Sequence, residues 1–266
     1  MLIKLINHTF VVLAYKESKD LENCIKSVLN QKYRSNVVIA TSTPNNYIDR
    51  ISKKYNLKVI VNPEKRGIAY DFNFAVNCVD STLVTIAHQD DIYECDYSKK
   101  IVEAYKKDKN ASIIFTDYYE LRGKNKIYNN MNLKIKRILL IPLRTHFLGK
   151  FKWWRRFVLK YGNAISCPAV TFVKKNTPKD VFICDLTCNV DWFAWEKLSK
   201  LNGSFVFVPK KLMGHRISHV STTTSIINSG VRTKEDLYMF KKFWPEFIAK
   251  FINKIYKNAE KSNKKM

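Results

Sequence analysis

Glycine and proline are scarce in this sequence, with seven of each among 266 residues. That scarcity excludes a collagen-like or low-complexity chain. Long hydrophobic runs are also missing, since no apolar stretch reaches the roughly 18 residues that a membrane-spanning helix needs. The first residues lead directly into an alternating apolar stretch and show no signal-peptide cleavage pattern. We therefore expect a cytoplasmic protein, and a hydrophobic content of 46% is enough to build a buried core.

Acidic residues are absent from one long stretch. Residues 121–179 carry 15 basic side chains and no acidic ones, whereas residues 1–120 carry 17 basic and 15 acidic side chains. The stretch also contains Trp153 and Trp154, and basic groups with aromatic ones are typical of a segment at an anionic membrane surface. A core-packed helix or hairpin with a solvated basic face is the alternative. No motif of a known nucleic-acid-binding module is present, so nucleic acid is not an expected partner.

The six cysteines are scattered along the chain. In a cytoplasmic protein we expect buried free thiols rather than disulfides. Cys184 and Cys188 lie four residues apart, but no second pair has the spacing of metal ligands. We therefore expect no zinc site there.

Strand-like and helix-like periods alternate through the first 120 residues. Short apolar runs predict strands at residues 10–15, 36–41, 58–62, 82–87 and 112–116. Amphipathic stretches predict a helix after Ser18 and further helices at residues 46–55, 68–79 and 96–107. This alternation predicts an α/β fold with a parallel sheet covered by helices. Ligands bind such sheets beyond the carboxyl ends of the strands.

Two adjacent carboxylates, Asp90 and Asp91, follow one of these predicted strands. Neighbouring negative charges are costly unless a cation neutralises them, and hard divalent ions bind carboxylate oxygens. The pair is therefore a candidate site for Mg²⁺ or Mn²⁺. Aspartates that cap the following helix are the alternative explanation.

The C-terminal third contains further candidate elements. A helix is expected at residues 185–201 and a strand at 205–208, followed by His215 and His219. A lone histidine is more often a structural residue than a ligand. Two histidines within five residues, next to an arginine and a run of hydroxyl residues, raise the odds of a ligand site only modestly. From residue 233 onward, apolar residues form a helical stripe. It consists of Leu237, Phe240, Phe243, Trp244, Phe247, Ile248, Phe251, Ile252 and Ile255.

Four stretches, in this order, resemble a family 2 glycosyltransferase of the GT-A fold. They are residues 10–17 followed by 21–31, residues 62–69 with Asn73, residues 88–93, and Val190-Asp191-Trp192. The resemblance covers about residues 8–224 and implies a Rossmann-like mixed sheet flanked by helices, with a basic aromatic insertion and C-terminal helices. It divides the chain into a nucleotide-sugar-binding half (1–120), a basic, aromatic segment that faces a membrane or an acceptor (121–179), an acceptor and catalytic-base half of the same domain (180–232) and a helical extension (233–266).

The resemblance also implies which residues bind a nucleotide-sugar donor. They are Ala14, Tyr15, Glu17, Thr41, Lys65, Asp71, Asn73, Asp90 and Arg216. Two departures from the family pattern leave the donor's base open. His88 stands where an aspartate is usual, and Ala40-Thr41-Ser42 stands where many relatives carry acidic residues that read the base.

Transfer from a nucleoside diphosphate needs charge stabilisation on the leaving phosphates and a base for the attacking hydroxyl. The resemblance implies that Asp191 is this base, with Asp185 as the second choice, and that the sugar, of hexosyl or deoxyhexosyl type, is transferred with inversion. A divalent metal, Mn²⁺ or Mg²⁺, would be held by Asp90 and Asp91, with His219 as a third ligand. Residues 221–230, rich in small polar side chains, are a candidate lid.

The expected acceptor is a polyprenyl-linked saccharide, as in bacterial surface-polysaccharide assembly, reached from the inner face of the cell membrane. The net charge of +24 suits an anionic membrane surface. Two alternatives remain. One is a basic α/β protein that binds nucleic acid or another polyanion without catalysis, and the other is a relative that binds donor but has lost transfer.

Overall fold

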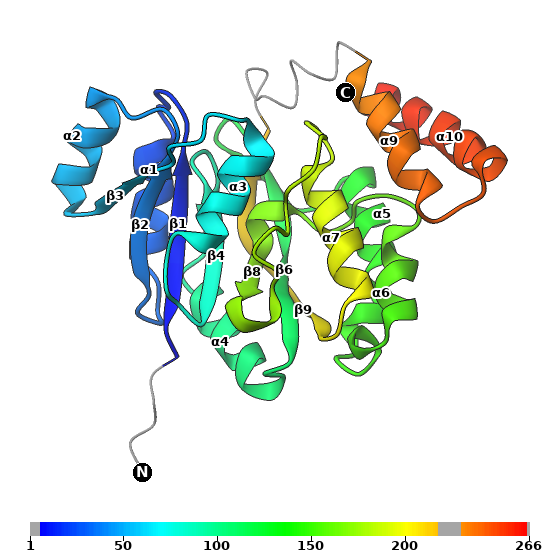
Figure 1. The fold of residues 1–266 in the computed structure, drawn as a ribbon, viewed down its shortest axis with the longest axis horizontal. Helices are drawn as coiled ribbons and strands as arrows, with labels where there is room; N and C mark the ends of the chain where they lie inside the picture. Colours follow the sequence, from blue (N-terminus) through cyan, green and yellow to red (C-terminus); the bar gives the residue numbers. More distant parts are fainter. Residues whose placement is uncertain (1–5, 218–229, 265–266) are drawn as a thin grey trace.

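The computed structural model describes residues 6–217 and 230–264 (Figure 1). The strands are β1 (His8–Ala14), β2 (Asn36–Thr41), β3 (Lys58–Val61), β4 (Leu83–His88), β5 (Ile92–Tyr93), β6 (Ala111–Arg122), β7 (Asn125–Ile127), β8 (Val170–Val173) and β9 (Ser204–Arg216). The α-helices are α1 (Leu21–Leu29), α2 (Asn46–Tyr55), α3 (Ile68–Asn77), α4 (Tyr97–Lys107), α5 (Met131–Leu139), α6 (Lys152–Leu159), α7 (Val190–Lys200), α9 (Val231–Lys241) and α10 (Glu246–Lys264).

The strands form one mixed sheet. Their order is β3-β2-β1-β4-β8-β6-β9-β5, and β7 pairs with β6. Strands β3, β2, β1 and β4 are parallel, as the alternation of strands and helices predicts. Beyond β4 the sheet is mixed, as the resemblance implies, because β8 runs antiparallel to both β4 and β6. The long strands β6 and β9 are parallel to each other and join this second half together.

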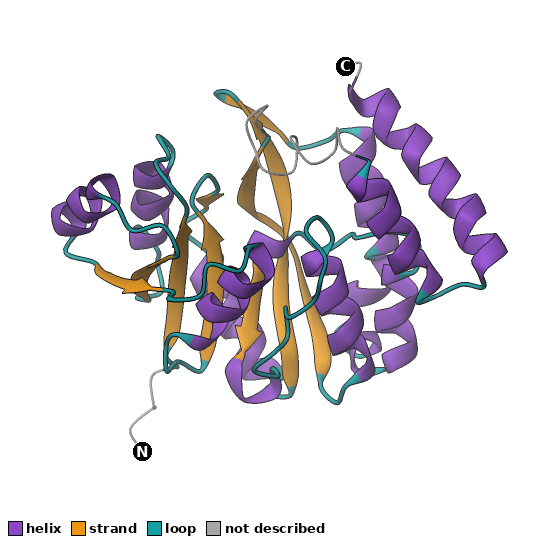
Figure 2. Ribbon diagram, turned by 45° about the horizontal axis from the view of Figure 1, so that its top comes forward, coloured by secondary structure: helices purple, strands orange, loops and turns teal. Residues whose placement is uncertain are grey.

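Helices cover both faces of the sheet (Figure 2). The apolar runs of the central strands are buried on both sides, which is why they lack the polar alternation of a half-exposed strand. Helix α1 buries Leu21, Cys24, Ile25 and Val28 along one face, whereas Leu29, at its end, is 44% exposed. Helix α2 begins at Asn45, whose side chain accepts a hydrogen bond from the Ile48 amide, and ends at Asn56 in the left-handed conformation.

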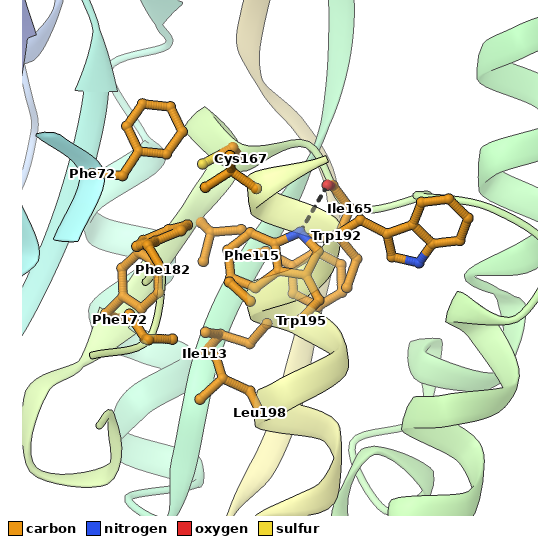
Figure 3. Close-up of a cluster of buried hydrophobic side chains, with 14 of the residues drawn as sticks. Phe72, Ile113, Phe115, Ile165, Cys167, Phe172, Phe182, Trp192, Trp195 and Leu198 are labelled. Carbon is orange, nitrogen blue, oxygen red and sulfur yellow. Dashed lines mark hydrogen bonds between the residues drawn. The ribbon is translucent and has the colours of Figure 1, made fainter. Parts of the chain in front are cut away.

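A tryptophan-rich core joins the sheet to α7. Trp192 and Trp195 on this helix are fully buried, and Figure 3 shows Trp195 among Phe115, Phe172 and Phe182. The Trp195 indole Nε1 donates a 3.2 Å hydrogen bond to the carbonyl of Ile165. Because the indole N–H is paired, the ring can be buried without the cost of an unsatisfied donor. This packing fixes the start of α7 relative to the strand ends.

The C-terminal apolar stripe is divided between two helices. A turn at residues 242–245 ends α9, and α10 then starts at Glu246. On α10, Ala249 and Ile252 contribute to the core, but Phe247 is 74% exposed. The prediction of a single packed stripe is therefore wrong for part of α10. Among the described residues, no helix is both long enough and apolar enough to cross a membrane.

Much of the positive charge in residues 121–179 is paired inside the protein. Arg155 is 1% exposed and donates to the Leu201 carbonyl. Arg156 on α6 forms a 2.8 Å ion pair with the buried Glu196 of α7. Arg155 therefore lies in the interior and not on the solvated basic face that the alternative describes. The six cysteines are all free thiols, as expected.

Candidate active site

The carboxyl ends of β2 and β3 and the first turn of α3 meet at Asp71. Its carboxylate accepts a 2.9 Å hydrogen bond from the Ser42 hydroxyl and a 2.8 Å hydrogen bond from the Asn62 side-chain amide. Thr41 is fully buried and its hydroxyl accepts from the Thr43 amide. The structure therefore brings the predicted donor residues Thr41 and Asp71 to one edge of the sheet, the upper edge in Figure 1.

The end of β1 is tied to the end of β4. Gln89 accepts a hydrogen bond from the Tyr15 amide and donates one to the Tyr15 carbonyl, at 2.9 and 3.0 Å. This pairing follows Ala14, the last residue of β1, and leaves the Tyr15 ring 47% exposed over the strand ends. Lys16 has a φ of 53°, and its amide donates to the Thr43 hydroxyl. Glu17 is exposed at the same edge.

Asp91 lies at the centre of the turn after β4 and is completely buried. Its Oδ1 accepts a 2.8 Å hydrogen bond from the Arg216 amide and one of 3.1 Å from Nδ1 of His215. The Arg216 Nε in turn donates 2.9 Å to the Asp90 carbonyl. These contacts lock the end of β9 onto the turn, across 125 residues of sequence. They support a structural role for the Asp91 carboxylate.

Asp90 has a different environment. Burial, followed by the neighbouring Asp91 charge, raises the pKa of Asp90 to about 6. No lysine or arginine of the described chain forms an ion pair with its carboxylate, whereas Arg216 contacts only its backbone carbonyl. A carboxylate at a strand end with a raised pKa and no lysine or arginine partner among the described residues is suited to binding a cation, which would favour the charged form.

Two histidines flank the carboxylates. Burial lowers the pKa of His88 to about 4, and its ring lies 5.0 Å from the Phe72 ring. His88 is therefore neutral and stands in the place of an acidic residue without supplying charge. Burial alone would lower the pKa of His215, but Asp91 outweighs it and raises that pKa. His215 lies within hydrogen-bond distance of Asp91, whereas His219 is outside the described residues.

Asp191 lies in the first turn of α7 and is held by two donors. Its Oδ2 accepts a 2.7 Å hydrogen bond from the Asn163 side chain, and its Oδ1 accepts one of 2.8 Å from the Trp192 amide. Burial raises the pKa of Asp191, and these hydrogen bonds and the Lys136 charge oppose the rise. A buried carboxylate with a raised pKa has the properties of a general base.

Asp191 and the aspartate turn both lie near Cys167. Burial raises the pKa of the Cys167 thiol, and both the Asp191 and Asp91 charges contribute to the rise. Lys136 lies near both groups as well, because its charge lowers the pKa values of Asp191 and of His215. Its ammonium donates a 2.9 Å hydrogen bond to the Tyr118 hydroxyl. Asp91, in the turn after β4, and Asp191, in the first turn of α7, therefore lie in one neighbourhood although they are far apart in the sequence.

Helix α9 holds the loop that leads into Asp191. The Glu235 carboxylate is buried and accepts hydrogen bonds from the amides of Thr187, Cys188 and Asn189 at 2.8 to 2.9 Å. The Thr187 hydroxyl donates a fourth, at 2.9 Å. The side chain of Asn189 donates 2.8 Å to Asp236. These contacts stabilise the N-terminus of α7, where a negative charge is also favourable.

The other predicted residues are placed less centrally. Lys65 is exposed in the turn between β3 and α3, and Asn73 accepts a 3.3 Å hydrogen bond from the Phe182 amide. Asp185, the second choice for the base, is exposed. His219 and residues 221–229 of the candidate lid lie outside the described residues.

Sequence reasoning missed Gln89, Lys136, Asn163 and Glu235. Lys136 belongs to the basic stretch of residues 121–179, and the composition of that stretch predicted contact with a membrane. Asn163 follows the family-like motifs without a pattern of its own, and Glu235 contacts residues 46 to 48 positions earlier. Only Gln89 had a local signal, because it lies between His88 and Asp90 at a strand end.

The chemistry of the site is compatible with a divalent metal. Within the described chain, no three His, Cys, Asp or Glu side chains are grouped as a metal site would require. Asp90 nevertheless fits the test for a ligand, since it is a half-buried oxygen donor without a lysine or arginine partner among the described residues and its pKa is raised to about 6. Asp91 fits less well because the Arg216 amide and His215 occupy its Oδ1.

Comparison with known sequences identifies one family. The model described as Glycosyl transferase family 2 matches residues 9–162. The match begins within β1, includes the aspartate turn and extends through α6, and it stops directly before Asn163, so that Asp191 lies beyond it. No curated protein sequence matches the chain.

Solved structures of similar fold include three glycosyltransferases. Residues 1–349 of Staphylococcus aureus TarS, in complex with UDP-GlcNAc, align with a TM-score of 0.64 and 14% identity, over 93% of this chain and 70% of that one. The mannosyltransferase PcManGT of Pyrobaculum calidifontis, in complex with GDP-Man and Mn²⁺, aligns with a TM-score of 0.60 and 13% identity, over 92% of this chain and 68% of that one. Glucosyl-3-phosphoglycerate synthase of Mycobacterium tuberculosis, in complex with Mn²⁺ and UDP-Glc, aligns with a TM-score of 0.53 and 11% identity, over 89% of this chain and 79% of that one. At these identities the likeness shows a shared GT-A fold.

Proposed function

The chain belongs to glycosyl transferase family 2 and is a glycosyltransferase, and on this premise we propose an inverting, metal-dependent transfer from a nucleoside-diphosphate sugar to a lipid-linked saccharide. The observation that carries the proposal is the position of Asp191. The Asp191 carboxylate lies near the aspartate turn, since the charges of Asp191 and Asp91 both act on the Cys167 thiol, and Asn163 and the Trp192 amide hold its two oxygens. In this proposal Asp191 supplies the base, and the neighbouring strand ends supply the donor site.

The donor occupies the carboxyl ends of β1, β2 and β4 in this proposal. Tyr15 offers an exposed ring against the nucleoside, and Asp71, held by Ser42 and Asn62, offers a fixed acceptor for its hydroxyl groups. The three similar structures were solved with UDP-GlcNAc, GDP-Man and UDP-Glc, which supports a nucleotide-sugar donor. Because these donors carry different bases, they leave the base of this donor open. Ala14, Glu17, Lys65 and Asn73 complete the proposed donor site, with Arg216 toward the diphosphate.

A divalent metal, Mn²⁺ or Mg²⁺, would be held by Asp90, with Asp91 and His219 as the further proposed ligands. When bound, such an ion neutralises charge on a leaving diphosphate. Two of the similar structures were solved with Mn²⁺, which supports this choice. Arg216 lies within 2.9 Å of the Asp90 carbonyl and adds positive charge beside the same turn.

Asp191 takes the proton of the acceptor hydroxyl as that oxygen attacks the anomeric carbon. The new carbon–oxygen bond forms on the face opposite the leaving diphosphate, so that the configuration inverts in a single displacement. General base catalysis of this kind contributes roughly 10²–10⁴-fold to a rate. Asp191 is favoured over Asp185, because Asp185 is exposed and has no described partner that would orient it.

The acceptor in this proposal is a polyprenyl-linked saccharide of surface-polysaccharide synthesis, at the cytoplasmic face of the cell membrane. The net charge of +24 supports attraction to an anionic membrane surface. Family membership favours the enzyme over a protein that binds a polyanion without catalysis.

The test combines donor binding with transfer. Thermal unfolding is measured with UDP, GDP, TDP, CDP and ADP, each with Mn²⁺ or with a chelator, for the wild type, Asp90→Ala and the exposed control Asp80→Ala. A nucleotide at about 100 times its Kd stabilises the fold by about 2.7 kcal/mol. We expect one nucleotide to give a metal-dependent shift that Asp90→Ala loses and Asp80→Ala keeps. The matching radiolabelled donor should then label organic-extractable lipid. No shift with any nucleotide would contradict the proposal.

A further inference from the structure

Helix α10 presents an apolar face to solvent. Phe247, Phe251 and Ile255 recur every fourth residue and are 74%, 66% and 55% exposed. The opposite face is the one that packs, through Ala249 and Ile252. Figures 1 and 2 both show α10 as the outermost helix, at the end of the molecule opposite β3. A row of large exposed apolar side chains is costly in water and marks an interaction surface.

The α10 face is bordered by lysines. Lys250, Lys254 and Lys257 are exposed on the same three turns of helix. Glu246 is the one acidic residue in the described side chains of α10, and Lys241 and Lys250 neutralise it at 3.1 and 3.0 Å. Apolar residues with lysines along their border are typical of a helix that lies in the plane of a membrane surface.

A row of aromatic rings continues from this helix onto α6. The rings of Trp153 and Phe157 are 5.7 Å apart, those of Phe157 and Tyr161 are 6.1 Å apart, and those of Tyr161 and Trp244 are 5.6 Å apart. Trp153 is 63% and Tyr161 is 41% exposed. Trp244 precedes Phe247 by three residues, so the row leads to the start of α10. The indole Nε1 of Trp244 donates a 2.8 Å hydrogen bond to the Lys160 carbonyl, which ties the turn before α10 to the end of α6.

Positive charge accompanies the aromatic row as well. The Lys160 ammonium lies 4.4 Å from the Phe157 ring centroid and 4.9 Å from those of Tyr161 and Trp244. Tryptophan and tyrosine prefer the depth of lipid headgroups, and a lysine can reach phosphate from that depth while its stem covers apolar surface. The arrangement therefore favours an anionic lipid surface over an uncharged apolar partner.

We infer that the outer face of α10 (Phe247, Phe251 and Ile255) and the aromatic row (Trp153, Phe157, Tyr161 and Trp244) together dock the protein on the surface of an anionic phospholipid bilayer. The docking is peripheral, with the helix lying parallel to the surface and its lysines on the phosphates. The inference deepens the proposed function, because it names the surface that brings the enzyme to a lipid-linked acceptor. It differs from the sequence-based expectation, in which residues 121–179 alone would contact the membrane.

The test is flotation of the full chain with vesicles of phosphatidylcholine alone or with 30% phosphatidylglycerol, at low and high salt. We expect binding to the anionic vesicles, weakened by high salt. The double substitution Phe247→Glu/Phe251→Glu should reduce this binding at least tenfold. Leu29→Glu, which changes an apolar residue 44% exposed at the end of α1, is the matched control and should leave it unchanged. Thermal unfolding of each variant verifies that it is folded.

Three results would overturn the inference. They are wild-type binding that does not depend on anionic lipid, double-variant binding equal to that of the wild type, and a double variant that only converts a dimer into a monomer. The last would assign the surface to a second copy of the chain. The metal-dependent nucleotide shift is measured on the same variants. A variant that no longer binds vesicles but keeps the metal-dependent nucleotide shift has lost membrane docking and not the donor site.

Discussion

The side-chain amide of Asn163 donates a 2.7 Å hydrogen bond to Oδ2 of Asp191. This contact joins the segment between α6 and β8 to the first turn of α7, 28 residues later. The Trp192 amide holds the other oxygen at 2.8 Å, so the carboxylate has a fixed orientation. The two hydrogen bonds also stabilise the charged form of a group whose pKa burial raises.

Asn163→Ala should therefore affect the proposed base in two ways. Loss of the hydrogen bond raises the pKa of Asp191 further, so the acid limb of the kcat profile should move to higher pH. Loss of orientation should lower the maximal rate by about tenfold. The donor-nucleotide Kd should stay within a few-fold of the wild-type value. A profile that keeps its acid limb in place would contradict the assignment of Asn163 as a positioning residue.

Asp191→Asn should abolish transfer, with a loss on the order of 10³-fold in kcat, because an amide cannot accept the proton. Nucleotide binding should change by no more than a few-fold, since Asp191 is proposed to act on the acceptor. In the wild type, activity should fall as the pH decreases through the raised pKa of Asp191, because only the carboxylate acts as a base. Asp185→Asn is the control. Full activity of the Asp191 variant would remove this assignment, and a dead Asp185 variant would move the role there.

Asp90→Asn should stabilise the metal-free protein while abolishing metal-dependent nucleotide binding. The folded protein keeps the Asp90 proton up to about pH 6, whereas the unfolded chain releases it near pH 3.8. The contribution of Asp90 to stability is thus fully present below pH 3.8 and is lost as the pH rises through 6. At pH 7.5 the substitution should raise the free energy of unfolding by about 1–3 kcal/mol. Denaturant unfolding with a chelator measures this, with Asp80→Asn as the control.

Glu235→Ala should destabilise the fold and slow transfer together. It removes the acceptor of four hydrogen bonds and leaves buried amides at Cys188 and Asn189 without a partner. We expect a loss of about 3–5 kcal/mol in the free energy of unfolding. The neighbouring exposed Lys234→Ala should cost less than about 0.5 kcal/mol. Equal melting temperatures for the two variants would show that the Glu235 contacts do not hold the start of α7.

The sequence by itself determined the elements whose signals are local. Apolar runs and helical stripes predicted most strands and helices of the first 120 residues to within a few positions, because a buried strand and an amphipathic helix each impose a short period. The short strand β5 was not predicted, and β6 extends to Arg122, well beyond the predicted end at residue 116. The carboxylates Asp90 and Asp91 were found for the same reason, since they directly follow a predicted strand. The family-like motifs then pointed to Asp191 at the start of a helix, which is where it lies.

Tertiary structure alone decided which of these groups meet. Asp91 is paired with the end of β9, 125 residues later, and Glu235 with the loop before α7, and no local period records such distant partners. Packing also separated charges and apolar residues that look alike in sequence. Lys136 turns inward to Tyr118 and Arg155 is buried, whereas Phe251 on the C-terminal stripe faces solvent. Which face of a helix is covered depends on its neighbours in space, and the chain's own periodicity does not contain that information.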